Sequence, residues 1–216
     1  MRNTENLKSY GDDPVSSALC KKNAELTALI QNALRSGATE VAIVSARDII
    51  VEQALADLCR EPRCENYGLS KSCPPHVSGP AAFKNRLGQF GQGLFFKIDV
   101  PSEILFSSER REFFQLLHEI AAGIEHDAKY MGFPDAKAYA GGSCKTIFCH
   151  NHRECLALSE KGICRNPLHA RPSMSGFGIN VSKLIETAGW TKDSITHGTH
   201  SAAIKTAAIY GLVLIH

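Results

Sequence analysis

The sequence has no long hydrophobic run, and this absence is the first guide to the class of protein. The longest apolar stretch, residues 207–215, has the length of a buried strand and is too short to cross a bilayer. The first residues, MRNTENLKSYGDDP, lack the apolar segment of a secretory signal. We therefore expect a cytoplasmic protein with no membrane partner.

An excess of either charge is also missing. Lys and Arg number 24 and Asp and Glu number 22, which gives a net charge of +2 with no block of like charge. Nucleic-acid-binding proteins usually carry a stronger basic excess, so we expect no nucleic-acid partner. The glycine fingerprints of dinucleotide and phosphate-binding loops are absent, as is the motif around a nucleophilic serine. These absences disfavour nucleotide-dependent enzymes and hydrolases.

What remains is a composition typical of a folded domain, with 44% hydrophobic and 21% charged residues. Residues 1–20 are expected to form a polar N-terminal arm and residues 21–216 a single α+β metal-binding domain. Hydrophobic periodicity predicts helices at 24–36, 49–58, 108–131 and 180–188, and strands at 41–44, 93–100, 136–140 and 204–215. Strands and helices do not alternate strictly, which favours a mixed or antiparallel sheet with packed helices and two cysteine-rich metal-binding loops.

The eight cysteines are clustered rather than scattered through the apolar pattern. One group is Cys59, Cys64 and Cys73, the other is Cys144, Cys149, Cys155 and Cys164, and Cys20 stands alone. A reducing compartment argues against a disulfide framework. Cysteines gathered in loops rich in Gly and Pro indicate metal ligands.

The C-terminal group contains a full set of four thiolates for one metal centre. Structural zinc sites prefer two close pairs of ligands, whereas here the ligands are separated by four, five and eight residues. We therefore favour a [4Fe–4S] cluster, with structural zinc as the alternative. The cations nearby, which would offset the cluster's negative charge, are Lys145, Arg153, Lys161, Arg165 and Arg171. His150, His152 and His169 are possible ligands of a mixed zinc site.

The N-terminal group supplies only three thiols, so the fourth position of its centre is open to several ligands. Cys20, His76, water or a substrate are the candidates. Cys73 is followed by two prolines, which stiffen the chain and hold His76 in a fixed direction. A cluster with four cysteines would only transfer electrons, whereas three cysteines and an exposed iron would make a Lewis-acid site.

The spacing of the motifs resembles a known family. The first half is Cys64-x-x-Tyr-Gly followed by Cys73-Pro-Pro, and the second is the four-cysteine loop ending in Cys164-Arg-Asn-Pro, followed by Arg171-Pro-Ser-Met. Together they resemble the predicted metal-binding proteins grouped as domain of unknown function 2284. The resemblance extends from about residue 24 to the C-terminus and implies metal binding without a defined reaction. Other cysteine-rich proteins of anaerobes are similar, which favours iron–sulfur over zinc.

Three functional hypotheses follow from these residues. The first is a redox protein with two [4Fe–4S] clusters that passes electrons to a redox partner protein or to its own substrate site. The second is a structural zinc module that mediates protein interaction. The third is an enzyme whose three-cysteine cluster binds substrate at an exposed iron.

Overall fold

The computed structural model describes residues 14–159, 162–191 and 206–216, with side chains from residue 21 onward. The helices are α1 Pro14–Arg35, α2 Gln53–Asp57, α3 Gly79–Leu87, α4 Arg110–Tyr130, α5 Cys144–Phe148 and α6 Val181–Thr187. The strands are β1 Glu40–Ser45, β2 Gln92–Pro101, β3 Lys137–Ala140 and β4 Thr206–Ile215. Short 3-10 segments are η1 Ala46–Asp48, η2 Ser102–Phe106, η3 Leu156–Leu158 and η4 Met174–Phe177. Among these residues, no helix is both long and apolar enough to cross a membrane.

The four strands form one antiparallel sheet in the order β1-β2-β4-β3. The α+β class with an antiparallel sheet and packed helices is therefore confirmed. The two central strands pair over their whole length, and at one pair Phe96 lies opposite Gly211. A Cβ atom at Gly211 would overlap the Phe96 ring, so this position requires the glycine.

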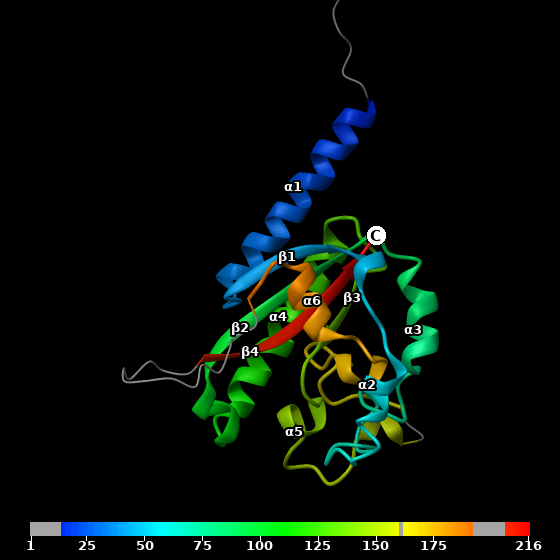
Figure 1. Ribbon diagram of the computed structural model, residues 1–216, viewed down its shortest axis with the longest axis vertical. Coiled ribbons are helices and arrows are strands. Elements are labelled where there is room, and N and C mark those ends of the chain that lie inside the picture. The colour runs from blue at the N-terminus through cyan, green and yellow to red at the C-terminus, as the bar shows by residue number, and fades with distance from the viewer. Residues whose placement is uncertain (1–13, 160–161, 192–205) are drawn as a thin grey trace, which may run out of the picture.

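Helices and loops cover both faces of the sheet (Figure 1). On one face α1 and α4 pack over the even-numbered residues of β2, including Leu94 and Phe96. On the other face the odd-numbered Phe95 packs with residues of α3, η4 and α6 such as Phe83, Phe177 and Leu184. This division follows from the two-residue period of a strand. It also explains why β2 and β4 are nearly continuous hydrophobic runs.

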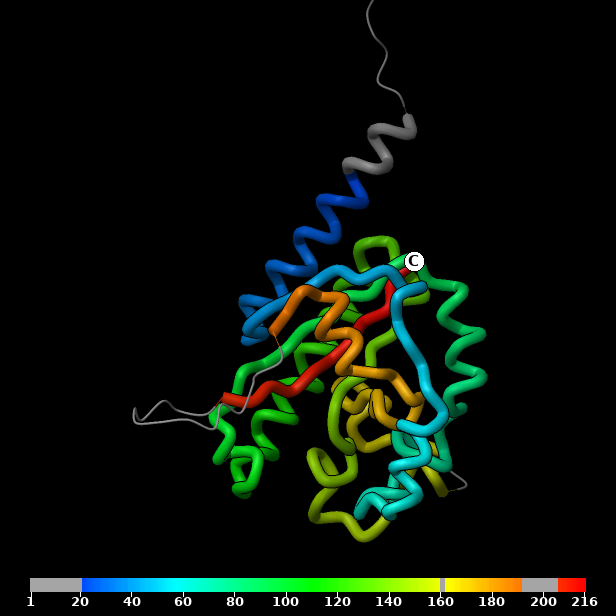
Figure 2. The backbone as a smooth tube through the Cα atoms, in the orientation of Figure 1, coloured from blue at the N-terminus to red at the C-terminus, as the bar shows by residue number. Residues whose placement is uncertain are grey.

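The cysteine-bearing loops lie at one end of the molecule, below the sheet as drawn in Figure 2. Helix α1 extends away from the opposite end (Figure 1). The sheet and its two cores thus form a frame, and the loops between α2 and α3 and after β3 project from it.

Several boundaries differ from the sequence-based expectation. The first helix begins at Pro14, ten residues before the expected start. The helix expected at 49–58 is only the short α2, because Val51 instead bridges to Ile179. Helix α3 was not expected, since it starts within a segment dominated by Gly and Pro. The first residues of the expected strand at 204–215 lie outside the described part of the chain.

Candidate metal centre

The four-cysteine loop begins where β3 ends. Gly142 has a φ of +82°, and a Cβ atom there would lie 2.9 Å from the Phe114 ring of α4, so glycine is required at this turn. Cys144 is the first residue of α5, and Cys149 follows the last. Cys155 precedes η3, and its carbonyl accepts from the Leu158 N–H at 3.0 Å. These short helices and turns fold residues 144–159 back on themselves.

All four cysteines of this loop line one small cavity. Its wall also contains Ser70, from the other cysteine loop, and Phe148. Ser70 is fully buried, and its hydroxyl lies close enough to the Cys144 thiol to lower the pKa of that thiol. The cavity, of about 20 Å³, is therefore a small space enclosed by the four cysteines of one loop and by Ser70 of the other.

Asn166 donates hydrogen bonds to two sulfur atoms of this cavity. Its backbone N–H donates to Cys164 Sγ and its side-chain Nδ2 donates to Cys149 Sγ, both at 3.4 Å. Hydrogen bonds to sulfur are a recognised means of stabilising metal-bound thiolates. The two Asn166 contacts are therefore of the kind that would stabilise thiolates bound to a metal.

Two of the expected cations hold the loop together. Lys145 Nζ donates to the carbonyls of Cys149 at 2.9 Å and His152 at 2.6 Å. Arg165 Nη1 donates to the carbonyl of Glu154 at 2.8 Å. Both side chains also line the sulfur cavity, so their positive charges would offset a negative centre there.

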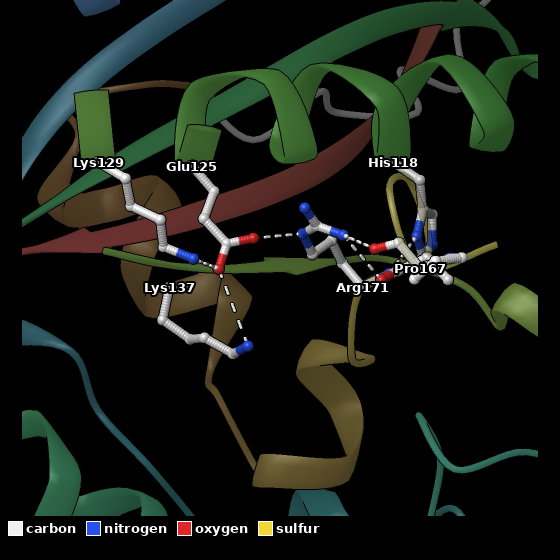
Figure 3. A network of polar contacts seen from close by, with 7 residues as sticks. His118, Glu125, Lys129, Lys137, Pro167 and Arg171 are labelled. Carbon is white, nitrogen blue, oxygen red and sulfur yellow. Dashed lines mark hydrogen bonds and ion pairs between the residues drawn. The ribbon is translucent and has the colours of Figure 1, made fainter. Parts of the chain in front are cut away.

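A third cation, Arg171, ties the end of the loop to α4 (Figure 3). Its Nε lies 2.5 Å from Oε2 of Glu125, whose side chain is only 4% exposed. Lys129 and Lys137 approach the other carboxylate oxygen at 3.1 and 3.8 Å. One buried carboxylate therefore collects three cations from the helix, the sheet and the loop. This network fixes the chain seven residues after Cys164.

His118 provides a second attachment between α4 and the loop. The Arg171 backbone N–H donates to His118 Nδ1 at 3.1 Å, so Nδ1 carries no proton. His118 Nε2 then donates to the carbonyl of Gly141 at 3.1 Å. Burial lowers the pKa of His118 to about 4, so the ring is neutral at physiological pH.

The three-cysteine group lines a separate cavity of about 140 Å³. Cys59 lies two residues beyond α2, and its carbonyl accepts from the Cys64 N–H at 3.0 Å. Cys73 is 5% exposed, and its N–H donates to the carbonyl of Ser70 at 3.2 Å. Burial, together with the neighbouring Cys64 and Cys73 thiols, raises the pKa of Cys59. The three thiols are therefore within electrostatic reach of one another.

The two cysteine groups meet at Ser143. The Cys73 thiol donates to Ser143 Oγ at 3.3 Å, and Ser143 directly precedes Cys144. Burial raises the pKa of Cys144 to about 11, opposed by the neighbouring Ser72 and Ser70 hydroxyls and reinforced by Cys73 and Cys155. Cys144 is thus in electrostatic contact with both groups. The two sulfur cavities share no lining residue, but Ser143 of one and Cys144 of the other are consecutive in the chain.

The histidine candidates lie elsewhere. His76 Nε2 is 3.3 Å from the carbonyl of Gly68, and His76 is not among the residues that line the three-cysteine cavity. His150 Nε2 lies 2.7 Å from Arg111 Nη1, and the ring of His169 stacks on Phe148. His152 does not line the four-cysteine cavity either. The side chain of Cys20 and residue Lys161 lie outside the described part of the molecule.

Among the described residues, no three Cys, His, Asp or Glu side chains are arranged as the ligands of a single metal ion.

A family model described as a predicted metal-binding protein, domain of unknown function 2284, matches residues 42–215. The chain belongs to this family. No curated protein and no solved structure matches the chain. The matched residues include both cysteine groups and leave out Cys20, and the family's description supports metal binding without specifying the metal.

Sequence reasoning predicted the cysteines as ligands but did not single out the polar residues around them. Ser70, Ser143 and Asn166 contact the thiols, although no spacing rule singles them out. The importance of Glu125 and His118 could have been inferred from the sequence, since both are polar residues that interrupt the apolar stripe of α4. A charged residue on the buried face of a helix almost always has a partner, which here is Arg171.

Proposed function

We propose that the chain binds two iron–sulfur clusters, one at each cysteine group, and that its activity is electron transfer. The proposal rests on the finding that the cysteines grouped in the sequence are also grouped around cavities in the structure. Each cysteine group lines its own cavity, and Cys73 of the three-cysteine group is hydrogen-bonded to Ser143, the residue before Cys144 of the other group.

Metal binding at either site would have to displace protons from partly buried thiols. The raised pKa values of Cys59 and Cys144 keep these thiols protonated near neutral pH. A metal centre displaces such protons, because only the thiolate is a ligand. The Asn166 hydrogen bonds and the cations Lys145 and Arg165 then face sulfur atoms that carry negative charge.

Ligand spacing favours clusters over zinc. The four-cysteine loop has no close ligand pair of the kind that structural zinc sites use. A bound cluster would supply one-electron redox chemistry, whereas zinc would supply none. The contact between the two groups favours transfer of electrons from one site to the other.

A redox partner protein is part of this proposal. Ile163 and Leu168 flank Cys164 and are 66% and 74% exposed. Exposed apolar residues beside a redox centre are suited to transient docking. Arg153 is also exposed on this loop, which favours a partner with an acidic docking surface.

The test is the metal content of protein purified and reconstituted without oxygen, with excess iron and sulfide. We expect about eight iron atoms and as many acid-labile sulfides per chain, the content of two [4Fe–4S] clusters. Stoichiometric zinc without sulfide would refute the proposal and support a structural zinc module. Zinc in a sample purified in air is not informative, because zinc replaces lost iron at thiolate sites.

Matched variants assign the iron to the two groups. Cys149→Ser should remove the cluster of the four-cysteine group, and Cys73→Ser that of the three-cysteine group. Each should retain about half of the iron under reconstitution conditions. Their electron paramagnetic resonance spectra should differ, because each retains a different cluster. Full iron content in either variant would contradict the assignment of that residue.

A further inference from the structure

A third cavity, of about 350 Å³, adjoins the three-cysteine site. It lies between the start of α4, the loop that leads into α5, and Glu65 and Asn66 of the first cysteine loop. Asn66, Gly142 and Ser143 line both this cavity and the three-cysteine cavity. The two spaces therefore share a wall beside the sulfur atoms. A volume of this size suits a small metabolite.

The charged wall of this cavity is positive. Arg110 and Arg111 both line it, and Glu65 is the one carboxylate among its lining residues. The ion pair of Arg110 with Glu65 is 3.6 Å long and joins side chains that are 53% and 71% exposed, so it is weak. Arg111 instead contacts the His150 ring. An arginine bonded to a ring nitrogen acceptor retains its full charge for an incoming anion.

The lining of the cavity also includes a hydrogen-bond acceptor that has no donor, the side-chain oxygen of Asn66. Asn66 Oδ1 is buried and has no hydrogen-bond partner among the described residues. It stands in the wall that the two cavities share. A buried amide oxygen in this state is costly until an N–H or O–H group occupies the site.

We propose that this cavity binds a small hydroxycarboxylate, with its carboxylate on Arg111 and its hydroxyl hydrogen-bonded to Asn66. The assignment rests on the proposed function in one respect. It places the ligand next to the open fourth position of the three-cysteine cluster. Three cysteines line that cavity, and His76 bonds away from it, so the ligand would be adjacent to the metal position that the protein leaves free. The three-cysteine group is then a substrate site, and the four-cysteine group is its electron source.

The experiment is a titration followed by ligand-observed nuclear magnetic resonance, with malate, succinate and inorganic phosphate as probes. Malate and succinate differ by one hydroxyl. We expect the reconstituted protein to bind malate at least about tenfold more tightly than succinate, the usual effect of a hydrogen bond to a buried acceptor. Phosphate binding as tight as that of malate would show a general oxyanion site and overturn the hydroxycarboxylate assignment.

Two variants test the two contacts separately. Arg111→Gln should weaken both malate and succinate about tenfold or more, because it removes a charge-assisted hydrogen bond. Asn66→Ala should weaken malate alone and make the two acids equivalent. Arg47→Gln is the matched control, since Arg47 is exposed on η1 and lines none of the three cavities. Equal losses in Arg47→Gln and Arg111→Gln, or no binding of malate to the wild-type protein, would overturn the proposal.

The same titration of metal-free protein separates this inference from the proposed function. Binding to the arginine wall should persist without metal. A malate-induced change in the electron paramagnetic resonance spectrum requires the three-cysteine cluster. Iron and sulfide without any malate effect would refute the cavity assignment alone. Malate binding by a protein that never takes up sulfide would refute the clusters but not the cavity.

Discussion

Replacement of Glu125 by Gln is the sharpest test of how the four-cysteine loop is held. The wild-type carboxylate is 4% exposed and lies 2.5 Å from Arg171, whose side chain is 12% exposed. The substitution keeps the volume and one acceptor oxygen but removes the negative charge. Arg171 would then be a nearly buried cation without a counter-charge, which typically costs 3–5 kcal/mol, so we expect a loss of about 3 kcal/mol in the free energy of unfolding.

The assay is urea unfolding of wild-type and variant proteins in the same metal-free, reduced state, because bound metal would add its own stabilisation. Lys129→Met is the matched control. Lys129 is another partner of Glu125, but the Lys129 side chain is 46% exposed. Its loss should not exceed about 1 kcal/mol. If Glu125→Gln also unfolds within about 1 kcal/mol of the wild type, the buried network does not stabilise the loop as argued.

Three further predictions concern pH, a glycine and the unassigned cysteine. The pKa of His118 is about 4 in the folded protein against 6.5 unfolded, so stability is complete above pH 6.5 and is lost as the pH falls toward 4. Urea unfolding at a series of pH values should show about 3 kcal/mol of acid-induced loss that is absent in His118→Gln. Gly142→Ala should cost about 1–3 kcal/mol in thermal unfolding because of its positive φ and the nearby Phe114 ring, whereas the control Gly123→Ala, on the exposed side of α4, should be neutral or stabilising. Cys20→Ala should keep all of the iron and sulfide measured by chemical analysis, and loss of half would identify Cys20 as the fourth ligand.

The main helices and strands could be predicted from the sequence, because hydrophobic periodicity and capping residues are local patterns. The apolar stripe of α4 predicted residues 108–131, and the structure gives Arg110–Tyr130. Asn180 was one of two expected caps of the last helix, and its side chain accepts from the Lys183 N–H. Apolar runs predicted strands at 93–100 and 204–215, and the structure has β2 and β4 there as the central pair of the sheet.

The arrangement of the cysteine loops could not be predicted from the sequence, because it depends on contacts between residues far apart in the chain. Cys73 and Ser143 are 70 positions apart, and no periodic pattern relates them. Helix α3 was missed for another reason, since Gly79 and Pro80 are turn residues in most contexts but here open a helix. The wall shared by two cavities is a property of folded loops and has no counterpart in the linear pattern.

The contact between the two cysteine loops has a consequence for how the two proposed clusters would be taken up. Residues 70–73 of the first loop contact Ser143 and Cys144 of the second, so ordering either loop also orders part of the other. The entropy of ordering this shared segment is then lost only once, by whichever site fills first. Uptake should therefore be positively cooperative, and by linkage each site must raise the affinity of the other by the same factor. If the two groups bind clusters as proposed, a cell short of iron would hold mainly empty and fully loaded molecules, with few that carry a single cluster.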